Sequence, residues 1–304
     1  MSNSSDTVPT TSPMTWEETI IELRKMDAYK SILHDSYLDE DLKMNVERFM
    51  VSDEFKETLK LFRQFDSASG TVLDIGAGNG VSTIALARSG YSVTALEPDT
   101  SETIGCGAIN SLVKTYQLQN VNVITGFGER LPFQDNSFDI VHVRQAMHHA
   151  RDLKQFLGEI SRVLKPGGHL FTIRDHVIFN EKDKQLFLET HPLQKFYGGE
   201  NAFLETEYTD AMRRSGLRVL KTIRYFDSVL NFAPLSQENL ASLPAQFTLD
   251  LNARAKQKFG ILGKLGLFQY IYRKAIQLKF GGAMDERRIP GRMYSFVATK
   301  PAFS

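Results

Sequence analysis

The central part of the chain alternates short apolar runs with longer segments of helical periodicity. Apolar runs of about five residues mark five strands: 71–75, 92–96, 121–125, 139–144 and 168–174. Helical patterns follow at 79–89, 101–117, 151–164 and 203–215. Strands that are apolar throughout are buried on both faces, which is typical of a parallel sheet with crossover helices. Two further runs, 217–224 and 292–299, complete a predicted α/β fold of seven strands, mostly parallel, with helices on both faces.

The chain on either side of these strands has a different texture. From Thr15 to about residue 65 the periodicity is helical, and Thr15 with Glu18 has the spacing of a capping box. Between the last two strands lie roughly 65 residues, whereas a hairpin loop takes about 2–5. We therefore divide the chain into five segments: a disordered tail at 1–14, a helical cap at 15–66, a core at 67–225, a helical insertion at 226–290 and the last core strand at 291–304.

Composition narrows the class of protein. The 304 residues include 36 Lys and Arg and 36 Asp and Glu, so no net field attracts nucleic acid. The single cysteine, Cys106, excludes an internal disulfide framework. The first residues lack the basic and apolar regions of a signal peptide, and no apolar run reaches the length of about 18 residues that would span a membrane. We expect a cytoplasmic protein that does not bind nucleic acid.

The second half of the predicted insertion is basic. Ten lysines and arginines lie between Arg254 and Arg292, against only Asp285 and Glu286. Apolar residues alternate with them at helical spacing over 261–272. We interpret this segment as a lid over the substrate; contact with an anionic membrane surface and packing of its apolar face on the core are the alternatives.

The stretch "VLDIGAGNG", residues 72–80, places glycines at the end of the first strand. A strand, a glycine-rich turn and a helix form a nucleotide-binding unit in which the ligand approaches the backbone closely. The dinucleotide fingerprint is G-x-G-x-x-G. Here Gly76, Gly78 and Gly80 give G-x-G-x-G, and Asp74 stands two residues before the first glycine.

The charge of Asp74 favours one ligand over another. Unit charges about 4 Å apart interact by about 4 kcal/mol at an effective dielectric of about 20, so a pyrophosphate would be repelled here. S-adenosylmethionine carries a sulfonium and an ammonium and would be attracted. Glu97, at the end of the second strand, is placed to accept the two ribose hydroxyls of either ligand. The sequence thus favours S-adenosylmethionine and leaves NAD as the rival.

Three motifs in order carry a family resemblance. "VLDIGAGNGVSTIALARSGYSVTALEPD", "GERLPFQDNSFDIVHVRQAMHHARD" and "RVLKPGGHLF" resemble the successive motifs of class I S-adenosylmethionine-dependent methyltransferases. The most similar subgroup includes the ubiquinone and menaquinone C-methyltransferases and many small-molecule O-methyltransferases. The resemblance covers about residues 70–175 and implies a Rossmann-like fold with S-adenosylmethionine as cofactor.

The resemblance also implies a set of cofactor-binding residues. Asp74 would contact the methionine amino group, Glu97 the ribose hydroxyls, and Arg144 with Gln145 would lie near the sulfonium. Many relatives read "GDAE" where this chain reads "GFGE", so Phe127 replaces an adenine-binding Asp; it would stack on adenine or simply fill the core. The full predicted set is Asp74, Gly76, Ala77, Gly78, Glu97, Pro98, Phe127, Gly128, Glu129, Arg144 and Gln145.

Three histidines are candidates for the base that takes a proton from an acceptor hydroxyl. His149 follows the fourth strand, and His176 lies just past the fifth, at the edge where doubly wound folds bind ligands. His191 belongs to "ETHPLQKFYGGENAF", a loop rich in aromatic and polar residues. The predicted substrate-binding residues are Arg174, Tyr197, Glu200 and Asn201.

Arg144 and Arg174 stand near the ends of neighbouring strands. If both face the pocket, they would neutralise a carboxylate or phosphate on the acceptor. Surface pairing with Asp175 or Asp152 is the alternative. The histidines and acids lack the spacing of a common metal site, so we expect no metal.

These observations predict an enzyme that transfers a methyl group from S-adenosylmethionine to a small molecule. The hydroxyl of a sugar or polyol-like metabolite is the preferred acceptor, with a histidine as base. C-methylation of a quinone, lipid-like or other small metabolite is the first alternative. An inactive cofactor-binding scaffold and an NAD-dependent oxidoreductase are alternatives of other classes.

Overall fold

The computed structural model describes residues 14–65, 67–191, 193–194, 196–232, 234–280 and 286–302. The predicted tail at 1–14 therefore lies outside the described residues except for Met14.

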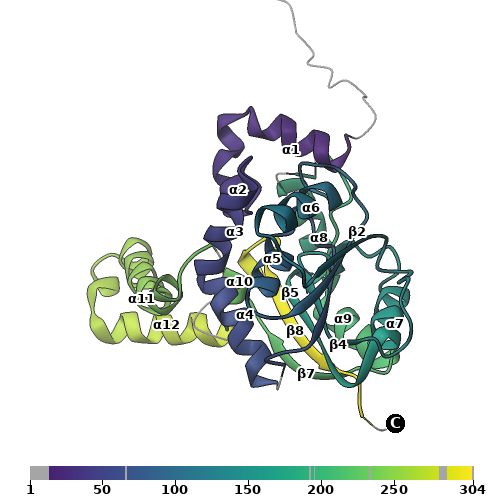
Figure 1. The fold of residues 1–304 in the computed structure, drawn as a ribbon. Helices are drawn as coiled ribbons and strands as arrows, with labels where there is room; N and C mark the ends of the chain where they lie inside the picture. The colour runs from purple at the N-terminus through teal and green to yellow at the C-terminus, as the bar shows by residue number, and fades with distance from the viewer. Residues whose placement is uncertain are drawn as a thin grey trace, which may run out of the picture.

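A single central sheet organises the chain (Figure 1). Its strands are β1 (Thr71–Ile75), β2 (Ser92–Glu97), β3 (Val121–Thr125), β4 (Phe138–Arg144), β5 (Leu164–Ile178), β6 (Phe203–Leu204), β7 (Arg218–Ile223) and β8 (Met293–Thr299). The order is β3-β2-β1-β4-β5-β8-β7, with β6 paired to β5 beside this path. Only β8 runs antiparallel to its neighbours β5 and β7. All seven predicted strands are confirmed, but the count is eight, because two residues of β6 are too few to produce a sequence pattern.

Helices surround this sheet and form most of the remaining structure. The α-helices are α1 (Trp16–Arg24), α2 (Lys30–Asp35), α3 (Leu42–Val51), α4 (Asp53–Gln64), α5 (Val81–Arg88), α6 (Cys106–Thr115), α7 (Leu153–Val163), α8 (Glu181–Thr190), α9 (Glu205–Arg214), α10 (Val229–Phe232), α11 (Gln237–Phe259) and α12 (Gly266–Phe280). Short 3₁₀ turns are η1 (Asp27–Tyr29), η2 (Met147–His149), η3 (Leu262–Lys264) and η4 (Glu286–Arg288). The capping box at Thr15 and Glu18 is confirmed at the start of α1.

Alternate residues of the central strands enter two separate cores. Leu73 and Val141 pack in the core covered by α7 and α9, whereas Val72, Ile140 and Phe171 pack in the core covered by α3, α4 and α5. Side chains alternate across a strand, so a sheet covered on both faces needs apolar residues at every position. This double burial is the physical reason for the unbroken apolar runs in the sequence.

The N-terminal helices contact the loop between α8 and β6. Leu193 and Phe196 of this loop pack against the small core formed by α1, α2 and Ile104. The rings of Trp16 and Tyr197 lie 5.4 Å apart, in an edge-on contact. These contacts fix the loop that carries several of the predicted substrate-binding residues.

A long helical hairpin, α11 with α12, projects beside α4 in Figure 1. Its α12 packs mainly on α11 and η3. The alternative that residues 261–272 turn their apolar face to the core is wrong, because Ile261 is 79% exposed and Leu262, Leu265 and Ile271 are more than half exposed. Within the described ranges, no helix combines the length and apolarity required to cross a bilayer.

Candidate active site

The glycine-rich turn joins β1 to α5. Gly76, Gly78 and Gly80 have φ angles of 68°, 55° and 87°, a region that residues with a side chain rarely adopt. A Cβ at Gly76 would lie 2.5 Å from the Cβ of Ala146, whereas a Cβ at Gly78 would meet no atom within 4 Å. The turn therefore needs glycine at Gly76 for packing, and at Gly78 it presents bare backbone to open space.

Glu97 at the end of β2 faces this turn. Its Oε2 accepts a 2.7 Å hydrogen bond from the Gly78 N–H, and its Oε1 accepts one of 3.0 Å from the Asp99 N–H. Burial raises the pKa of Glu97 to about 7, despite these hydrogen bonds. Ala77 is buried behind the turn and Pro98 is exposed beyond the strand. A carboxylate next to an open backbone is suited to accept hydroxyl groups of a ligand.

Asp74 is engaged by the protein itself. Its Oδ1 lies 2.8 Å from Nδ1 of His142 on β4, and its Oδ2 accepts a 2.6 Å hydrogen bond from the hydroxyl of Thr83 on α5. The side chain is buried. The carboxylate thus ties β1 to β4 and α5, and its contact with a ligand stays a prediction.

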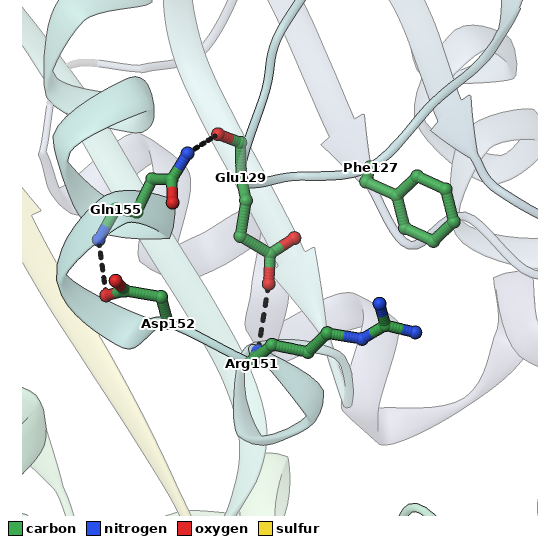
Figure 2. Close-up of a pocket in the computed structure, with 5 residues that line it drawn as sticks. All are labelled: Phe127, Glu129, Arg151, Asp152 and Gln155. Carbon is green, nitrogen blue, oxygen red and sulfur yellow. Dashed lines mark hydrogen bonds between the residues drawn. The ribbon is translucent and has the colours of Figure 1, made fainter.

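A surface pocket of about 260 Å³ lies beside the loop after β3 (Figure 2). The carboxylate of Glu129 accepts a hydrogen bond from the Arg151 N–H, and the carbonyl of Glu129 accepts one from the Gln155 side chain. Phe127 is 58% exposed, so the alternative that this ring fills the core is wrong. Gly128 must be glycine, because a Cβ there would collide with the ring of Phe156. The pocket therefore offers an exposed aromatic face beside a backbone that packs closely on Phe156.

Arg144 and Arg174 converge, but on a carboxylate of the protein. Arg144 donates to Glu54 of α4 at 2.7 and 3.2 Å, and Arg174 donates to the same carboxylate at 2.9 Å. Burial alone would raise the pKa of Glu54, but the two guanidinium groups hold it below its ordinary value. Both interpretations drawn from the sequence are therefore wrong. The two arginines do not pair with Asp175 or Asp152 at the surface, and they do not face an open pocket, because both bind the buried Glu54.

The backbone at these two strand ends is strained. Gln145 and Arg174 have φ angles of 52° and 62° although neither is glycine. The pairing of β5 with β8 shifts register between Thr172 and Asp175, which is a bulge at Arg174. The side chains of Gln145 and Arg174 both approach the sulfur of Met293. The predicted place of Gln145 beside a sulfonium stays a prediction.

Four histidines and a glutamate gather after β4 and near the end of β5. The predicted place of His176 just past the fifth strand is wrong, because β5 continues to Ile178 and His176 pairs with Met293 of β8. The ring centroids of His148 and His176 lie 4.8 Å apart, and those of His148 and His149 lie 4.1 Å apart. Glu200 places one carboxylate oxygen 3.8 Å from Nε2 of His148 and the other 3.6 Å from Nδ1 of His191. His149, His176 and His191 were the predicted bases; His148 was not among them, and the only signal for it in the sequence is its position in the His-His pair after β4.

Burial controls the protonation of this cluster. It lowers the pKa of His176 to about 3 and lowers that of His148 well below its ordinary value. It raises the pKa of Asp175, next to His148, to about 8 and also raises that of Glu200. The buried imidazoles are therefore neutral at pH 7, with a lone pair free to act as a ligand or acceptor.

The remaining predicted residues lie around this cluster. Nδ1 of His149 lies 3.1 Å from the carbonyl oxygen of Gly199, so the exposed His149 is tied to the same loop as Glu200. Tyr197 is exposed at the rim, and the amide oxygen of Asn201 accepts a hydrogen bond from the N–H of Ala202. The loop at 196–202 thus brings Glu200 to the histidines and carries Tyr197 and Asn201 on the same segment, while Arg174 belongs to the Glu54 cluster.

The chain is similar to methyltransferases over its central part. A family model described as a methyltransferase domain matches residues 73–172. YcgJ of Bacillus subtilis, an uncharacterised methyltransferase, is 36% identical over 116 residues, which are 36% of this chain and 42% of that protein. The demethylmenaquinone methyltransferase of Corynebacterium efficiens is 36% identical over 99 residues, which are 33% of this chain and 39% of that protein. The chain therefore spans less than half the length of these curated relatives.

Solved structures share the fold over a larger part of the chain. The crystal structure of YcgJ has a TM-score of 0.50 at 20% identity and covers 81% of this chain and 99% of its own. Geranyl diphosphate C-methyltransferase from Streptomyces coelicolor A3(2) has a TM-score of 0.53 at 15% identity, covering 81% of this chain and 76% of its own. At these identities, the likeness establishes a common Rossmann-like architecture.

Proposed function

We propose that the protein transfers a methyl group from S-adenosylmethionine to a hydroxyl group of a small molecule; the match of residues 73–172 to a methyltransferase domain supports this. The observation that carries the proposal is the glycine turn, where Gly78 presents backbone to open space beside the carboxylate of Glu97.

The described residues fit the cofactor at two places. Glu97 would hold the ribose hydroxyls, since a carboxylate that accepts two backbone N–H groups has lone pairs left for further donors. The exposed ring of Phe127 would cover the adenine, beside the pocket formed by Glu129 and Arg151. S-adenosylmethionine, when bound, supplies a methyl group already activated by the sulfonium.

The base that accepts the hydroxyl proton is best assigned to His149. Its Nδ1–H donates to the carbonyl of Gly199, which leaves the lone pair on Nε2 at an exposed position. Burial lowers the pKa of His149 as well, but the hydrogen bond to Gly199 raises it in part. His176 is the poorer base of the two, because burial lowers its pKa to about 3. His191 is turned toward Glu200. Tyr197 and Asn201, on the neighbouring loop, would contact the polar groups of a sugar or polyol-like acceptor.

C-methylation is the second candidate. It is favoured by a relative whose name is demethylmenaquinone methyltransferase, a protein matched over 39% of its length. A carbon acceptor that is already nucleophilic needs no strong base, so the two candidates differ in their dependence on His149. The NAD alternative has no support among the relatives reported above.

The first experiment measures cofactor binding, and the second measures transfer. Calorimetric titration with S-adenosylmethionine, S-adenosylhomocysteine and NAD should show binding of the two sulfur ligands alone. Carbon-13-labelled S-adenosylmethionine and a pool of hydroxylated acceptors then report transfer, and the chemical shift of the labelled methyl distinguishes oxygen from carbon. His149→Ala should lower the rate about 10²–10⁴-fold while S-adenosylhomocysteine still binds.

The matched control is His34→Ala, which removes an exposed histidine of α2 that contacts Asp39. A full rate in His149→Ala would overturn the assignment of the base, and a labelled methyl on carbon would replace O-methylation by the second candidate. NAD binding without binding of either sulfur ligand would reject the methyltransferase proposal itself.

A further inference from the structure

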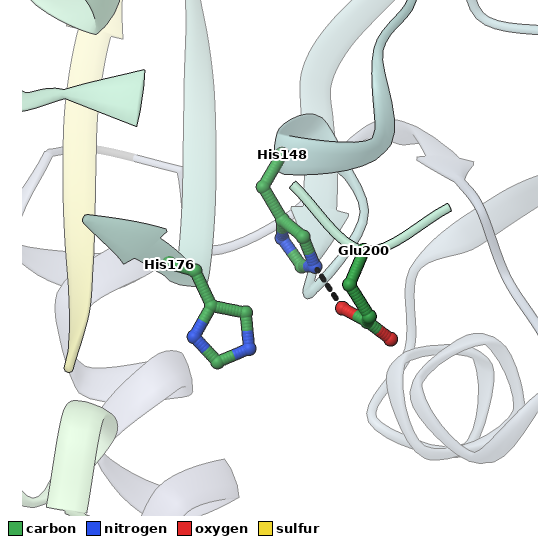
Figure 3. A group of neighbouring side chains, drawn as sticks. All are labelled: His148, His176 and Glu200. Carbon is green, nitrogen blue, oxygen red and sulfur yellow. Dashed lines mark ion pairs between the residues drawn. The ribbon is translucent and has the colours of Figure 1, made fainter. Parts of the chain in front are cut away.

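In the cluster of His148, His176 and Glu200, possible metal-ligand atoms of all three side chains lie close together. One ligand-capable atom from each of His148, His176 and Glu200 lies within 4.8 Å of the other two (Figure 3). These residues come from the turn after β4, the end of β5 and the loop before β6. From this arrangement, we propose that His148, His176 and Glu200 bind a divalent transition-metal ion.

The hydrogen bonds of the two histidines select the same nitrogen in each ring. Nδ1 of His176 lies 2.7 Å from the carbonyl oxygen of Gly291, so it must carry the proton and donate it. Nδ1 of His148 lies 3.0 Å from Oδ1 of Asp175. Histidine ligands of metals ordinarily donate their second nitrogen to a carboxylate or a carbonyl, which orients the ring. Both Nε2 atoms are thereby left as the metal-binding atoms.

The distances are close to those of a coordination shell. In a tetrahedral zinc site with bonds of about 2.1 Å, neighbouring ligand atoms stand about 3.4 Å apart. Nε2 of His148 and Oε2 of Glu200 are 3.8 Å apart, which is too long for a hydrogen bond and near the separation across an ion. Small side-chain rotations would bring the three atoms around one centre.

Among the described residues, no cationic Lys or Arg side chain pairs with the carboxyl groups of this cluster. Asp175 and Glu200 pair with histidines instead. Oδ2 of Asp175 and Nδ1 of His191 are buried and have no hydrogen-bond partner among the residues that the structure describes. Buried carboxyl groups are expected beside a metal or an opposite charge. A divalent ion at the centre would supply that charge.

The donor set points to zinc or a similar ion. Two imidazole nitrogens and one carboxylate are a set that catalytic zinc sites use, with a fourth position left open, whereas magnesium and calcium prefer oxygen donors. An acceptor hydroxyl bound at the open position would lose its proton more readily, because the ion stabilises the alkoxide. This last step rests on the proposed methyl transfer; the binding of the ion does not.

The test measures the ion directly on the full chain, prepared without a histidine tag and freed of metal with a chelator. Zn²⁺ is titrated by calorimetry, and Co²⁺ is titrated by its visible absorption, which reports the coordination geometry. We expect one equivalent of Zn²⁺ to bind with micromolar or stronger affinity. Glu200→Gln and His176→Gln should each weaken this affinity by about tenfold or more, because each removes one of three ligands.

His34→Gln is the control, because it removes an exposed histidine that contacts Asp39 and none of the three proposed ligands, and it should bind Zn²⁺ like the wild type. Thermal unfolding and titration with S-adenosylhomocysteine report the fold of every variant. Millimolar binding to the wild type, or equal affinity in all four proteins, would overturn the metal site. Failure of S-adenosylhomocysteine to bind a protein that still takes up Zn²⁺ would count against the proposed function alone.

Discussion

Two buried clusters of ionisable side chains lie near the ends of β4 and β5, and they differ in how completely their polar groups are paired. In the first, Glu54 receives hydrogen bonds of 2.7, 3.2 and 2.9 Å from Arg144 and Arg174. In the second, the contacts of the Glu200 carboxylate within the described part of the chain are those of 3.6 and 3.8 Å with two histidines. The same edge of the sheet thus holds one closed ion-pair network and one cluster with unused bonding capacity.

The difference shows which cluster is built for the fold and which for a ligand. Glu54 belongs to α4, so its pairs with two strand ends attach the N-terminal helices to the sheet. Buried polar groups without partners cost free energy, and proteins retain them where a ligand will use them. Predictions that separate folding from binding therefore test this comparison.

The largest effect is expected for Glu54→Gln. It leaves two buried guanidinium groups without their counter-ion, so the free energy of unfolding should fall by about 3–5 kcal/mol. Urea unfolding followed by circular dichroism measures the loss. The matched control is Glu47→Gln, which breaks exposed contacts with Arg88 and Tyr116 and should cost no more than about 1 kcal/mol. Equal losses in the two variants would show that the first cluster is not a structural one.

Gly78→Ala should separate ligand binding from stability. The left-handed backbone costs any residue with a Cβ roughly 1–2 kcal/mol, and this cost is shared by Gly90→Ala, a surface turn that also has open space around it. Only Gly78 borders the predicted cofactor site. We expect the two variants to lose similar stability, and Gly78→Ala alone to weaken S-adenosylhomocysteine by about tenfold or more, about 1.4 kcal/mol. Unchanged affinity would place the cofactor elsewhere.

Glu97 should give cofactor binding a dependence on pH. Burial raises its pKa to about 7, and hydroxyl donors bind the ionised carboxylate. Lowering the pH through this value protonates the carboxylate in the free protein, so affinity should fall toward tenfold per unit below about pH 7 and level off above about pH 8. Calorimetry of S-adenosylhomocysteine across this range measures it. Glu97→Gln should bind more weakly but without this dependence; the same slope in the variant would assign the titration to another group.

The glycine-rich turn and the strands of the sheet could be predicted from the sequence, whereas the Glu54 cluster could not. The glycines follow β1 directly and Glu97 ends β2, the strand paired with β1 and next to it in sequence, so one local motif predicts the turn and its carboxylate. The strands were predictable because double burial makes them apolar throughout. Glu54 was not, because it stands 90 and 120 residues from the arginines that it pairs with. Within the sequence of α4, Glu54 looks like any acidic residue in the first turn of a helix, and its burial appears only in the folded structure.

The sequence predicted several members of the histidine cluster as separate site residues, but it did not predict that they lie together. Its members come from three segments, and His148 and Glu200 are 52 positions apart (200 − 148), so no metal-ligand spacing appears in the chain. The packing of residues 261–272 on the core was predicted wrongly for a different reason. Their periodicity is helical, as the structure confirms, but periodicity does not say whether the apolar face of a helix packs on the protein or remains exposed.

Glu200→Gln tests the comparison at its smallest expected effect. Burial raises the pKa of Glu200, so ionising this carboxyl group in the metal-free protein is unfavourable. Its contacts of 3.8 and 3.6 Å with His148 and His191 are too long to offset much of this free-energy cost. A neutral amide of the same shape should therefore leave the unfolding free energy within about 1 kcal/mol of the wild type, or raise it. Urea unfolding without metal, beside Glu54→Gln, measures the contrast. A loss as large as that of Glu54→Gln would mean that both clusters hold the fold together, and the unpaired atoms around Glu200 would then need no ligand to explain them.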